Sequence, residues 1–264
     1  DLGTVIAGPL GCSMISELGA RVIHVESLSG EYHRGVRYGL AVNRTLAGSE
    51  GLCVDLKTLE GQAIIHKLVA KSDVLLHSMR PGAPERTGID YDQLTQINPT
   101  LIYVYAAGYG STGPHSHRPS MHPIPGAVCG GVVTQMGCGG LPNPDQPLSK
   151  EQIKQISMRL MKANDGSTDM NSSMALSAAM MLGIYARERT GEGQYIESTM
   201  LGANAYANAD DFYWHHGKKT RRTPDSEGYG LDALYRLYKC KDGWVFLACL
   251  FEEEWRDLCV NIDR

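Results

Sequence analysis

The chain has 264 residues and a formal net charge of −4, from 25 Lys and Arg against 29 Asp and Glu. With 42% hydrophobic and 20% charged residues it has the composition of a folded globular protein, which excludes disordered, collagenous and coiled-coil chains. The charge balance excludes the broad cationic surface that binds nucleic acid or anionic membranes. No uncharged apolar run approaches the roughly 18 to 20 residues that span a bilayer, and no secretory leader pattern is visible, so we expect a cytoplasmic protein.

The seven cysteines are scattered along the chain and form no C-x-x-C pair. An odd, unclustered set argues against a disulfide framework and against a zinc ribbon. The nine histidines are no better organised as ligands. We therefore expect no metal site and no tightly bound cofactor.

The first predicted elements form a strand, a turn, a helix and a second strand. Residues 4–7 are an extended apolar stretch, and Pro9 suits the first position of a helix that reaches Leu18. Gly19 suits a left-handed cap at the end of that helix, and residues 21–25 have the character of a strand.

The same order then repeats. Thr58 can cap a helix that runs to Val69, and residues 73–77 form a short buried strand. Asp90 opens another short helix, and residues 101–105 form a third strand. Alternating strands and helices predict an α/β domain with a parallel sheet covered on both faces.

This alternation stops in the middle of the chain. Residues 108–165 are rich in Gly, Pro, Ser and His and are predicted to be mostly loop, with a polar helix at 150–162. Residues 170–187 have the pattern of a long helix, and 194–200 resume an extended run. We expect the sheet domain to end close to this point.

The last part differs in composition. Residues 233–238 and 244–250 predict an antiparallel hairpin, and a short helix follows it. We therefore divide the chain into a large domain of residues 1–205 and the start of a smaller domain at 206–264.

Two features could carry chemistry. The first turn, Gly8-Pro-Leu-Gly11, matches neither a dinucleotide fingerprint nor a P-loop, so we expect no nicotinamide or nucleoside triphosphate site, although its amides could meet a phosphate.

Asp169 stands at the start of a helix of small and apolar residues. It could simply cap the helix. Alternatively, the helix amides and dipole could hold an ionised carboxylate there as a nucleophile.

The segment from Asp169 to Gln194 resembles the signature region of family III CoA-transferases, the family of formyl-CoA transferase, carnitine CoA-transferase and α-methylacyl-CoA racemase. It ends in Ala-Arg-Glu-Arg-Thr-Gly-Glu-Gly-Gln, and the Asp lies eighteen residues before Arg187, as in that family. Further resemblance lies, in the same order, in residues 5–9, 18–26, 54–61, 80–88, 97–103 and 108–114. The resemblance as a whole extends from about residue 3 to residue 260.

The resemblance implies an α/β fold with an open, Rossmann-like parallel sheet in a large CoA-binding domain and a smaller α+β domain. It also implies two chains interlocked as rings, hence a homodimer or a fused pseudo-dimer. Family members are longer, and their C-terminal part returns to the first domain, a segment that we do not find in these 264 residues. Fused relatives, such as the dimethylsulfoniopropionate CoA-transferase/lyase type, carry two such units.

The resemblance also implies roles for individual residues. Asp169 matches the catalytic nucleophile, with an acyl-CoA and a small carboxylic acid as substrates and coenzyme A as the group transferred. The positions that match the CoA contacts are Ala7, Gly8, Pro9, Ser78, Met79, Arg86 and, more loosely, Arg34. The positions that match the substrate pocket are Met121, His122, Gly228 and Gly230.

Some positions depart from the family pattern. Ser120-Met-His122 stands where Gly-Tyr-Asp or Gly-His-Asp is usual, and Ile6 stands where formyl-CoA transferase has Gln. A formate or oxalate substrate is therefore not expected.

Two other functions stay open. One is an acyl-CoA racemase or epimerase that uses Asp169 with His122 or Glu252 for proton exchange, and the other is a non-catalytic half of a fused enzyme.

Overall fold

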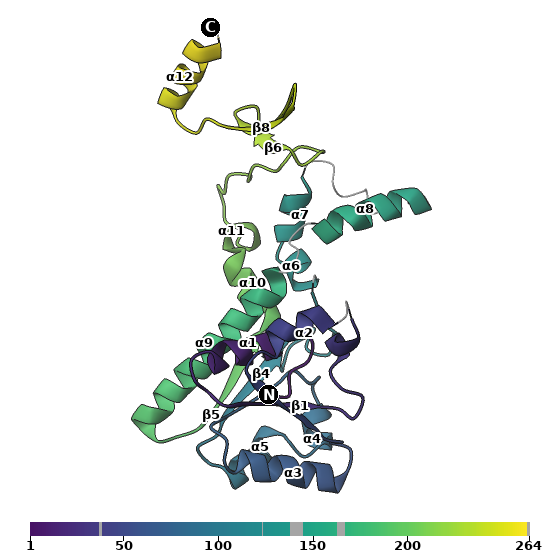
Figure 1. Ribbon diagram of the computed structural model, residues 1–264, viewed down its shortest axis with the longest axis vertical. Helices are drawn as coiled ribbons and strands as arrows, with labels where there is room; N and C mark the ends of the chain where they lie inside the picture. Colours follow the sequence, from purple (N-terminus) through teal and green to yellow (C-terminus); the bar gives the residue numbers. More distant parts are fainter. Residues whose placement is uncertain (37–38, 123, 138–144, 163–166, 263–264) are drawn as a thin grey trace. The chain divides into compact units, whose positions relative to one another are not determined.

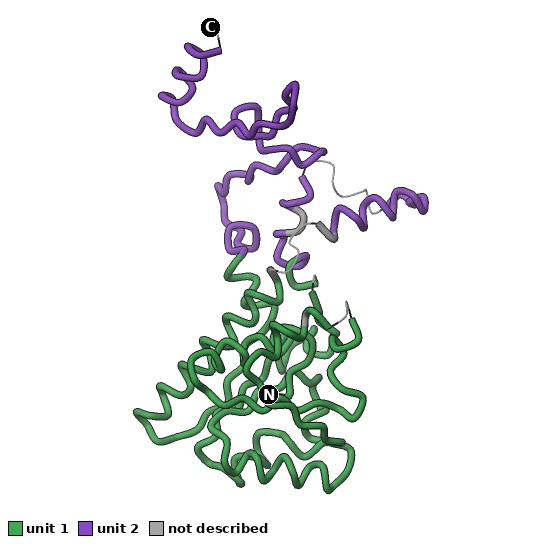
Figure 2. Tube along the Cα trace, in the orientation of Figure 1, with its two compact units in different colours: residues 1–126, 166–207 green, residues 127–165, 208–264 purple. Residues whose placement is uncertain are grey.

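A computed structural model describes residues 1–36, 39–122, 124–137, 145–162 and 167–262 (Figure 1). The chain divides into two compact units (Figure 2). Unit 1 comprises residues 1–126 and 166–207, and unit 2 comprises residues 127–165 and 208–264. No helix in the described part of the chain is long and apolar enough to cross a membrane.

Unit 1 is built on parallel strands. Strand β1 (Val22–Glu26) pairs with β2 (Ser49–Cys53). Strands β3 (Val74–His77), β4 (Ile102–Ala107) and β5 (Gln194–Thr199) form a second group, with β4 in the middle. All of these pairings are parallel, as the alternation of strands and helices predicted.

The first residues of the chain join the two groups of strands. The backbone N of Asp1 donates to the carbonyl of Ile23 (2.9 Å), and the N–H of Val25 donates to the carbonyl of Asp1 (2.8 Å). On the other side, the N–H of Leu2 donates to the carbonyl of Leu76 (2.7 Å). The result is one continuous series of parallel segments in which residues 1–3 lie between β1 and β3.

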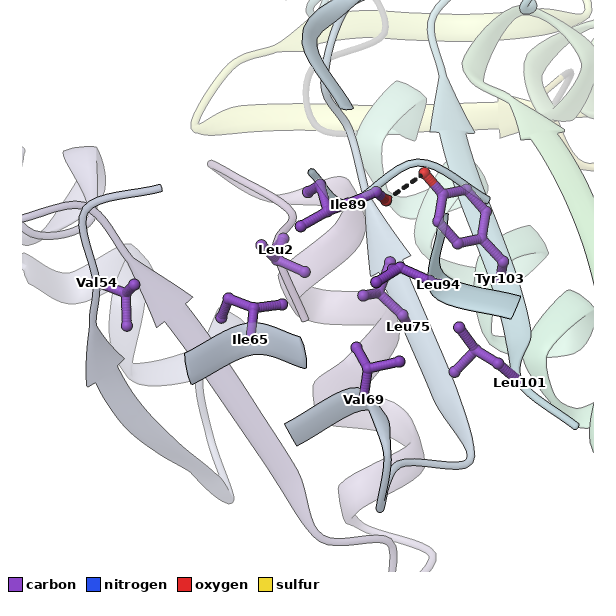
Figure 3. Close-up of a cluster of buried hydrophobic side chains, with 9 residues drawn as sticks. All are labelled: Leu2, Val54, Ile65, Val69, Leu75, Ile89, Leu94, Leu101 and Tyr103. Atoms are coloured by element: carbon purple, nitrogen blue, oxygen red, sulfur yellow. Dashed lines mark hydrogen bonds between the residues drawn. The ribbon is translucent and has the colours of Figure 1, made fainter. Parts of the chain in front are cut away.

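Helices cover both faces of this sheet (Figure 1). Helices α1 (Ala7–Ser16) and α9 (Ser167–Thr190) pack on one face, around a core that includes Leu76, Val104 and Leu176. Helices α3 (Leu59–Val69) and α5 (Tyr91–Ile97) cover the other face. The core there contains nine buried side chains, and the Tyr103 hydroxyl within it donates to the carbonyl of Ile89 at 3.0 Å (Figure 3).

Two of these helices begin where the sequence predicted. The Thr58 side chain accepts from the N–H of Gly61 at the start of α3, and Asp90 accepts from that of Gln93 at the start of α5. The other short helices of unit 1 are a 3₁₀ turn, η1, and α2, α4 and α10, at Tyr32–Gly35, Leu40–Thr45, Ala83–Arg86 and Met200–Ala207. Helix α6 (Ile124–Val128) crosses the boundary between the two units.

Unit 2 contains an antiparallel sheet of three strands, with β7 (Tyr235–Cys240) between β6 (Gly230–Asp232) and β8 (Gly243–Ala248). Strands β7 and β8 are the predicted hairpin, and α12 (Glu252–Ile262) follows them. The remaining helices of unit 2 are α7, α8 and α11, at Gly131–Met136, Lys150–Lys162 and Ala209–Phe212.

The division into units differs from the sequence-based division in one respect. The predicted boundary after residue 205 lies close to the end of unit 1, but residues 127–165 fall in unit 2 instead of the large domain. The reason is local packing. Met136 is buried against Ile156 and Leu160 of α8, and Thr134 donates to the carboxylate of Asp211 at 3.1 Å.

The structure also corrects the expected start of the fold. Residues 4–7 do not form a strand, because Val5 and Ile6 make a turn and α1 begins at Ala7. The extended segment lies earlier, at residues 1–3. Strand β2 was not predicted either, since Ser49-Glu-Gly51 lacks the β-branched and aromatic residues typical of strands. Helices α6, α7, α10 and α11 lie in stretches predicted as loop or left unassigned.

Candidate functional site

Asp169 is the third residue of α9, and only 7% of it is exposed. A buried asparagine of α10 holds this first turn of the helix. The Asn204 amide donates to the carbonyls of Thr168 (3.1 Å) and Met200 (2.8 Å), and Asn171 donates back to Asn204 (3.1 Å). The position of Asp169 is therefore fixed by a polar network and not by packing alone.

Two serines continue this network. Ser172 and Ser173 each donate a hydrogen bond of 2.8 Å to a backbone carbonyl one turn earlier, those of Thr168 and Asp169. Both serines are fully buried, so a polar strip of α9 faces the interior next to the catalytic candidate. Such back-bonding keeps these hydroxyls off the Asp169 carboxylate.

Burial dominates the electrostatic setting of Asp169. Burial raises the pKa of its carboxyl group above the ordinary value, and nearby His122 and, less strongly, His33 lower this pKa. Within the described part of the chain, no backbone N–H donates to this carboxylate. Desolvation is therefore the largest influence on the pKa of this carboxyl group, and it disfavours the ionised form.

His33 was not identified from the sequence. It lies in η1, far from Asp169 in the chain, and it carries a buried Nδ1 atom with no hydrogen-bond partner. His122 was identified, and it is the histidine with the larger effect on the pKa of Asp169. No local motif marks His33, because only the tertiary fold brings it close to α9.

Three of the positions that match CoA contacts, Ala7, Gly8 and Pro9, lie at the start of α1. This turn is closely packed: a Cβ at Gly8 would stand 2.9 Å from a methyl carbon of Leu76 and 3.1 Å from the Cα of Gly3. A larger residue than glycine would therefore push the turn away from the sheet. Helix α1 also lies directly against α9, which carries Asp169.

The other matching positions follow the carboxyl ends of β3 and β1. Ser78 and Met79 come directly after β3, and Arg86 is the exposed last residue of α4. Arg34 follows β1 and forms a two-pronged ion pair with the buried carboxylate of Glu26. The carboxyl ends of parallel strands are where ligands bind in open α/β sheets.

The substrate-pocket candidates are divided between the units. Met121 is 65% exposed, and His122 lies near Asp169 in unit 1. Gly228 and Gly230 belong to unit 2, where Gly228 precedes β6 and Gly230 is its first residue. Glu252 is also in unit 2, in the first turn of α12, where it pairs with Arg256 across one turn at 3.3 Å.

A separate pocket of about 280 Å³ lies on the α3/α5 side of the sheet. Its lining includes His77, Tyr103 and Tyr105, and His77 stacks on Tyr105 with ring centroids 4.9 Å apart. Burial lowers the pKa of His77 to about 4. Asp169 is not part of this pocket. Among the residues that the structure describes, no group of three His, Cys, Asp or Glu side chains could hold a metal ion.

The chain is similar to known proteins along its whole length. The model of CoA-transferase family III matches residues 1–264. The acetyl-CoA:oxalate CoA-transferase of Acetobacter aceti is 30% identical over 98% of this chain and 64% of its own length. A succinyl-CoA–L-malate CoA-transferase beta subunit of Chloroflexus aurantiacus is also 30% identical, over the whole chain and 63% of its own length.

A solved structure shares the fold. The crystal structure of a CaiB/BaiF family protein from Brucella suis has a TM-score of 0.76 and 25% identity, covering 99% of this chain and 67% of that one. The chain spans 63 to 67% of the length of these three proteins. It is an α/β protein with parallel strands and a small antiparallel sheet, and it belongs to CoA-transferase family III.

Proposed function

We propose that the protein transfers CoA from an acyl-CoA to a carboxylic acid, with Asp169 as the covalent nucleophile. The observation that carries this proposal is the setting of Asp169 within a family III chain: a buried carboxylate, fixed at the start of α9, close to two histidines. The relatives from Acetobacter aceti and Chloroflexus aurantiacus are CoA-transferases, and CoA esters are the substrates that the family implies.

In the proposed reaction, a carboxylate oxygen of Asp169 attacks the thioester carbonyl. The acyl–oxygen bond forms and the carbon–sulfur bond breaks. The products are an acyl-aspartyl anhydride and the CoA thiolate, which is the leaving group. The thiolate then attacks the aspartyl carbonyl, which releases the donor acid and forms an aspartyl-CoA thioester. The acceptor carboxylate reverses these steps and regenerates Asp169.

Burial serves this reaction in two ways. An anhydride hydrolyses if water reaches it, and the low exposure of Asp169 limits that access. A poorly solvated carboxylate is also a stronger nucleophile once it is ionised. The cost is the raised pKa, which the charges of His122 and His33 partly offset.

We assign CoA to the carboxyl ends of β1 and β3. The backbone of Ala7, Gly8 and Pro9, together with Ser78 and Met79, would line the pantetheine arm. The guanidinium groups of Arg86 and Arg34 would meet the phosphates or the adenine. Arg86 is exposed and has no acidic partner among the described residues, so it is available to an anion.

One observation favours a second candidate function. His122 lies close enough to Asp169 to influence its pKa, and an imidazole beside a carboxylate is the pairing needed for removing and returning an α-proton. An acyl-CoA racemase or epimerase would use this pair without any acceptor acid.

Deuterium exchange separates the two functions. The full chain is incubated with an acyl-CoA in deuterated water, with and without a panel of small carboxylic acids. We expect new CoA esters only when an acid is present, and no deuterium at the α-carbon in its absence. Rapid α-deuteration without an acceptor, combined with no CoA transfer, would instead establish proton exchange.

We also propose that the active protein is a dimer or a fused pair of units, as the resemblance implies. The large domain is Rossmann-like in this proposal, and the substrate glycines of unit 2 would complete the pocket. Light scattering on the purified full-length protein tests the assembly. A dimer mass, or a monomer mass with two units in one chain, is expected, and a single-unit monomer with full activity would contradict it.

A further inference from the structure

The turn that leads into α1 contains a strained residue. Val5 has φ +69°, and it is the one non-glycine residue with a positive φ in the part of the chain that the structure describes. A β-branched side chain is a true outlier in this left-handed region. Such a conformation persists only where surrounding contacts hold it.

A single carboxylate supplies that contact. The backbone N–H of Val5 donates to Oε1 of Glu31 at 3.0 Å, and Glu31 lies 26 residues further along the chain. Only 7% of Glu31 is exposed, so water competes poorly for this hydrogen bond. The bond is charge-assisted, because its partners keep the pKa of Glu31 below the ordinary value.

Glu31 is itself fixed from two directions. Its second oxygen lies 3.6 Å from Nε2 of the buried His24, and Nδ1 of that histidine lies 2.8 Å from the Asp1 carboxylate. Its backbone N–H donates to Glu26 at 2.8 Å, and Glu26 is paired with Arg34. The carboxylate is therefore a rigid anchor.

The anchored turn directly precedes Ala7-Gly8-Pro9, the backbone that we assign to CoA. Gly3 and Gly8 approach so closely that neither has room for a side chain. Because the backbone is tightly packed on both sides of Val5, we expect a change in the backbone conformation of Val5 to displace Gly8. Glu31 also precedes His33, one of the two histidines that act on the pKa of Asp169. Glu31 is therefore linked to two segments near the site: the start of α1, through the N–H of Val5, and the segment that contains His33.

We propose that Glu31 is a positioning residue that holds the strained Val5 turn, and through it the start of α1, in the conformation that binds CoA. This inference rests on the proposed function, because it takes Ala7-Gly8-Pro9 as CoA contacts. It assigns Glu31 no contact with the substrate.

The test is a pair of substitutions in the full chain. Glu31→Ala removes the acceptor, so Val5 should leave its strained conformation and displace the turn. We expect the KM for acyl-CoA to rise at least tenfold with kcat within a factor of about three, because the nucleophile stays in place. Glu50→Ala, which removes an exposed carboxylate paired with Arg21, is the matched control and should leave both constants unchanged.

Suppression makes the test specific. Glycine adopts a positive φ without strain, so adding Val5→Gly to Glu31→Ala should lower the raised KM at least threefold. A purely structural role for Glu31 gives no such rescue. An unchanged KM in Glu31→Ala, or a double variant no better than the single one, would overturn the proposal.

Amide hydrogen exchange separates this proposal from the proposed function. Residues 3–8 should exchange at least tenfold faster in Glu31→Ala than in the parent protein, and the double variant should recover part of that protection. If residues 3–8 exchange faster in Glu31→Ala but the parent protein does not bind acyl-CoA, the CoA assignment is wrong, although Glu31 still holds the turn. Unchanged exchange would reject the anchor whatever the protein binds.

Discussion

Ser177 of α9 donates a hydrogen bond of 2.9 Å to the backbone carbonyl of Gly11 in α1. This bond joins the helix that carries Asp169 to the helix that begins with the proposed CoA contacts. The two helices can approach this closely because Gly11 has no side chain: a Cβ there would lie 3.1 Å from the carbonyl O of Ser173. The position of Asp169 relative to the proposed CoA contacts therefore depends on the close packing of α1 on α9.

Gly11→Leu should consequently destabilise the protein and impair the site. The added side chain would meet the backbone of α9, and overpacking of this kind costs about 1 to 3 kcal/mol. Urea unfolding measures the loss. Lys67→Leu, which places the same side chain at an exposed position of α3, should change stability by less than about 0.5 kcal/mol. Equal effects of the two substitutions would contradict the close packing of α1 on α9.

His77 should make the protein sensitive to acid. Its pKa falls from 6.5 to about 4 on folding, so the unfolded chain binds the extra proton first as the pH drops. Stability from this group is complete above about pH 6.5 and decreases towards pH 4, with a loss of about 2 kcal/mol between pH 7 and pH 5. Urea unfolding at both pH values should show that loss, and His77→Phe, which keeps a ring on Tyr105, should reduce it. An equal loss in the variant would contradict the buried neutral imidazole.

The pH dependence of CoA transfer should report the setting of Asp169. The nucleophile must be ionised, and its raised pKa moves the acid limb of kcat/KM above that of an ordinary aspartate. His122→Asn removes a charge that lowers this pKa, so the limb should move to still higher pH. His33→Asn should move it in the same direction by less. A limb that stays in place or moves to lower pH in His122→Asn would show that the imidazole does not act on Asp169.

Arg86→Ala should weaken acyl-CoA binding. A guanidinium on a phosphate contributes charge-assisted hydrogen bonds of about 1.5 to 3 kcal/mol, so the KM should rise about tenfold or more with little change in kcat. Salt should weaken binding less in the variant than in the parent protein. Arg189→Ala, at an exposed arginine near the end of α9, should have neither effect. An unaltered KM and salt response in Arg86→Ala would show that Arg86 does not contact CoA.

Local signals in the sequence predicted the parallel framework well. Thr58 and Asp90 mark helix starts through short-range hydrogen bonds, and buried strands such as 101–105 stand out as apolar runs. The turn at Val5 could not be predicted, because valine disfavours its conformation and the group that accepts from its N–H, Glu31, lies 26 residues away. The proximity of His33 to Asp169 could not be predicted either, because the two residues are far apart in the chain. The raised pKa of Asp169 depends on its burial, which the tertiary fold determines.

The central claim is that Asp169 forms a covalent bond to the acyl group and then to CoA. The most direct measurement is to treat the full-length protein with acyl-CoA and then hydroxylamine, and to locate the modified residue by peptide mass spectrometry. We predict a hydroxamate at Asp169 that appears only with acyl-CoA, and an Asp169→Ala variant with less than a few per cent of the transfer activity and nearly unchanged CoA binding. A hydroxamate at another residue, or a variant that transfers CoA at a substantial rate, would contradict the account.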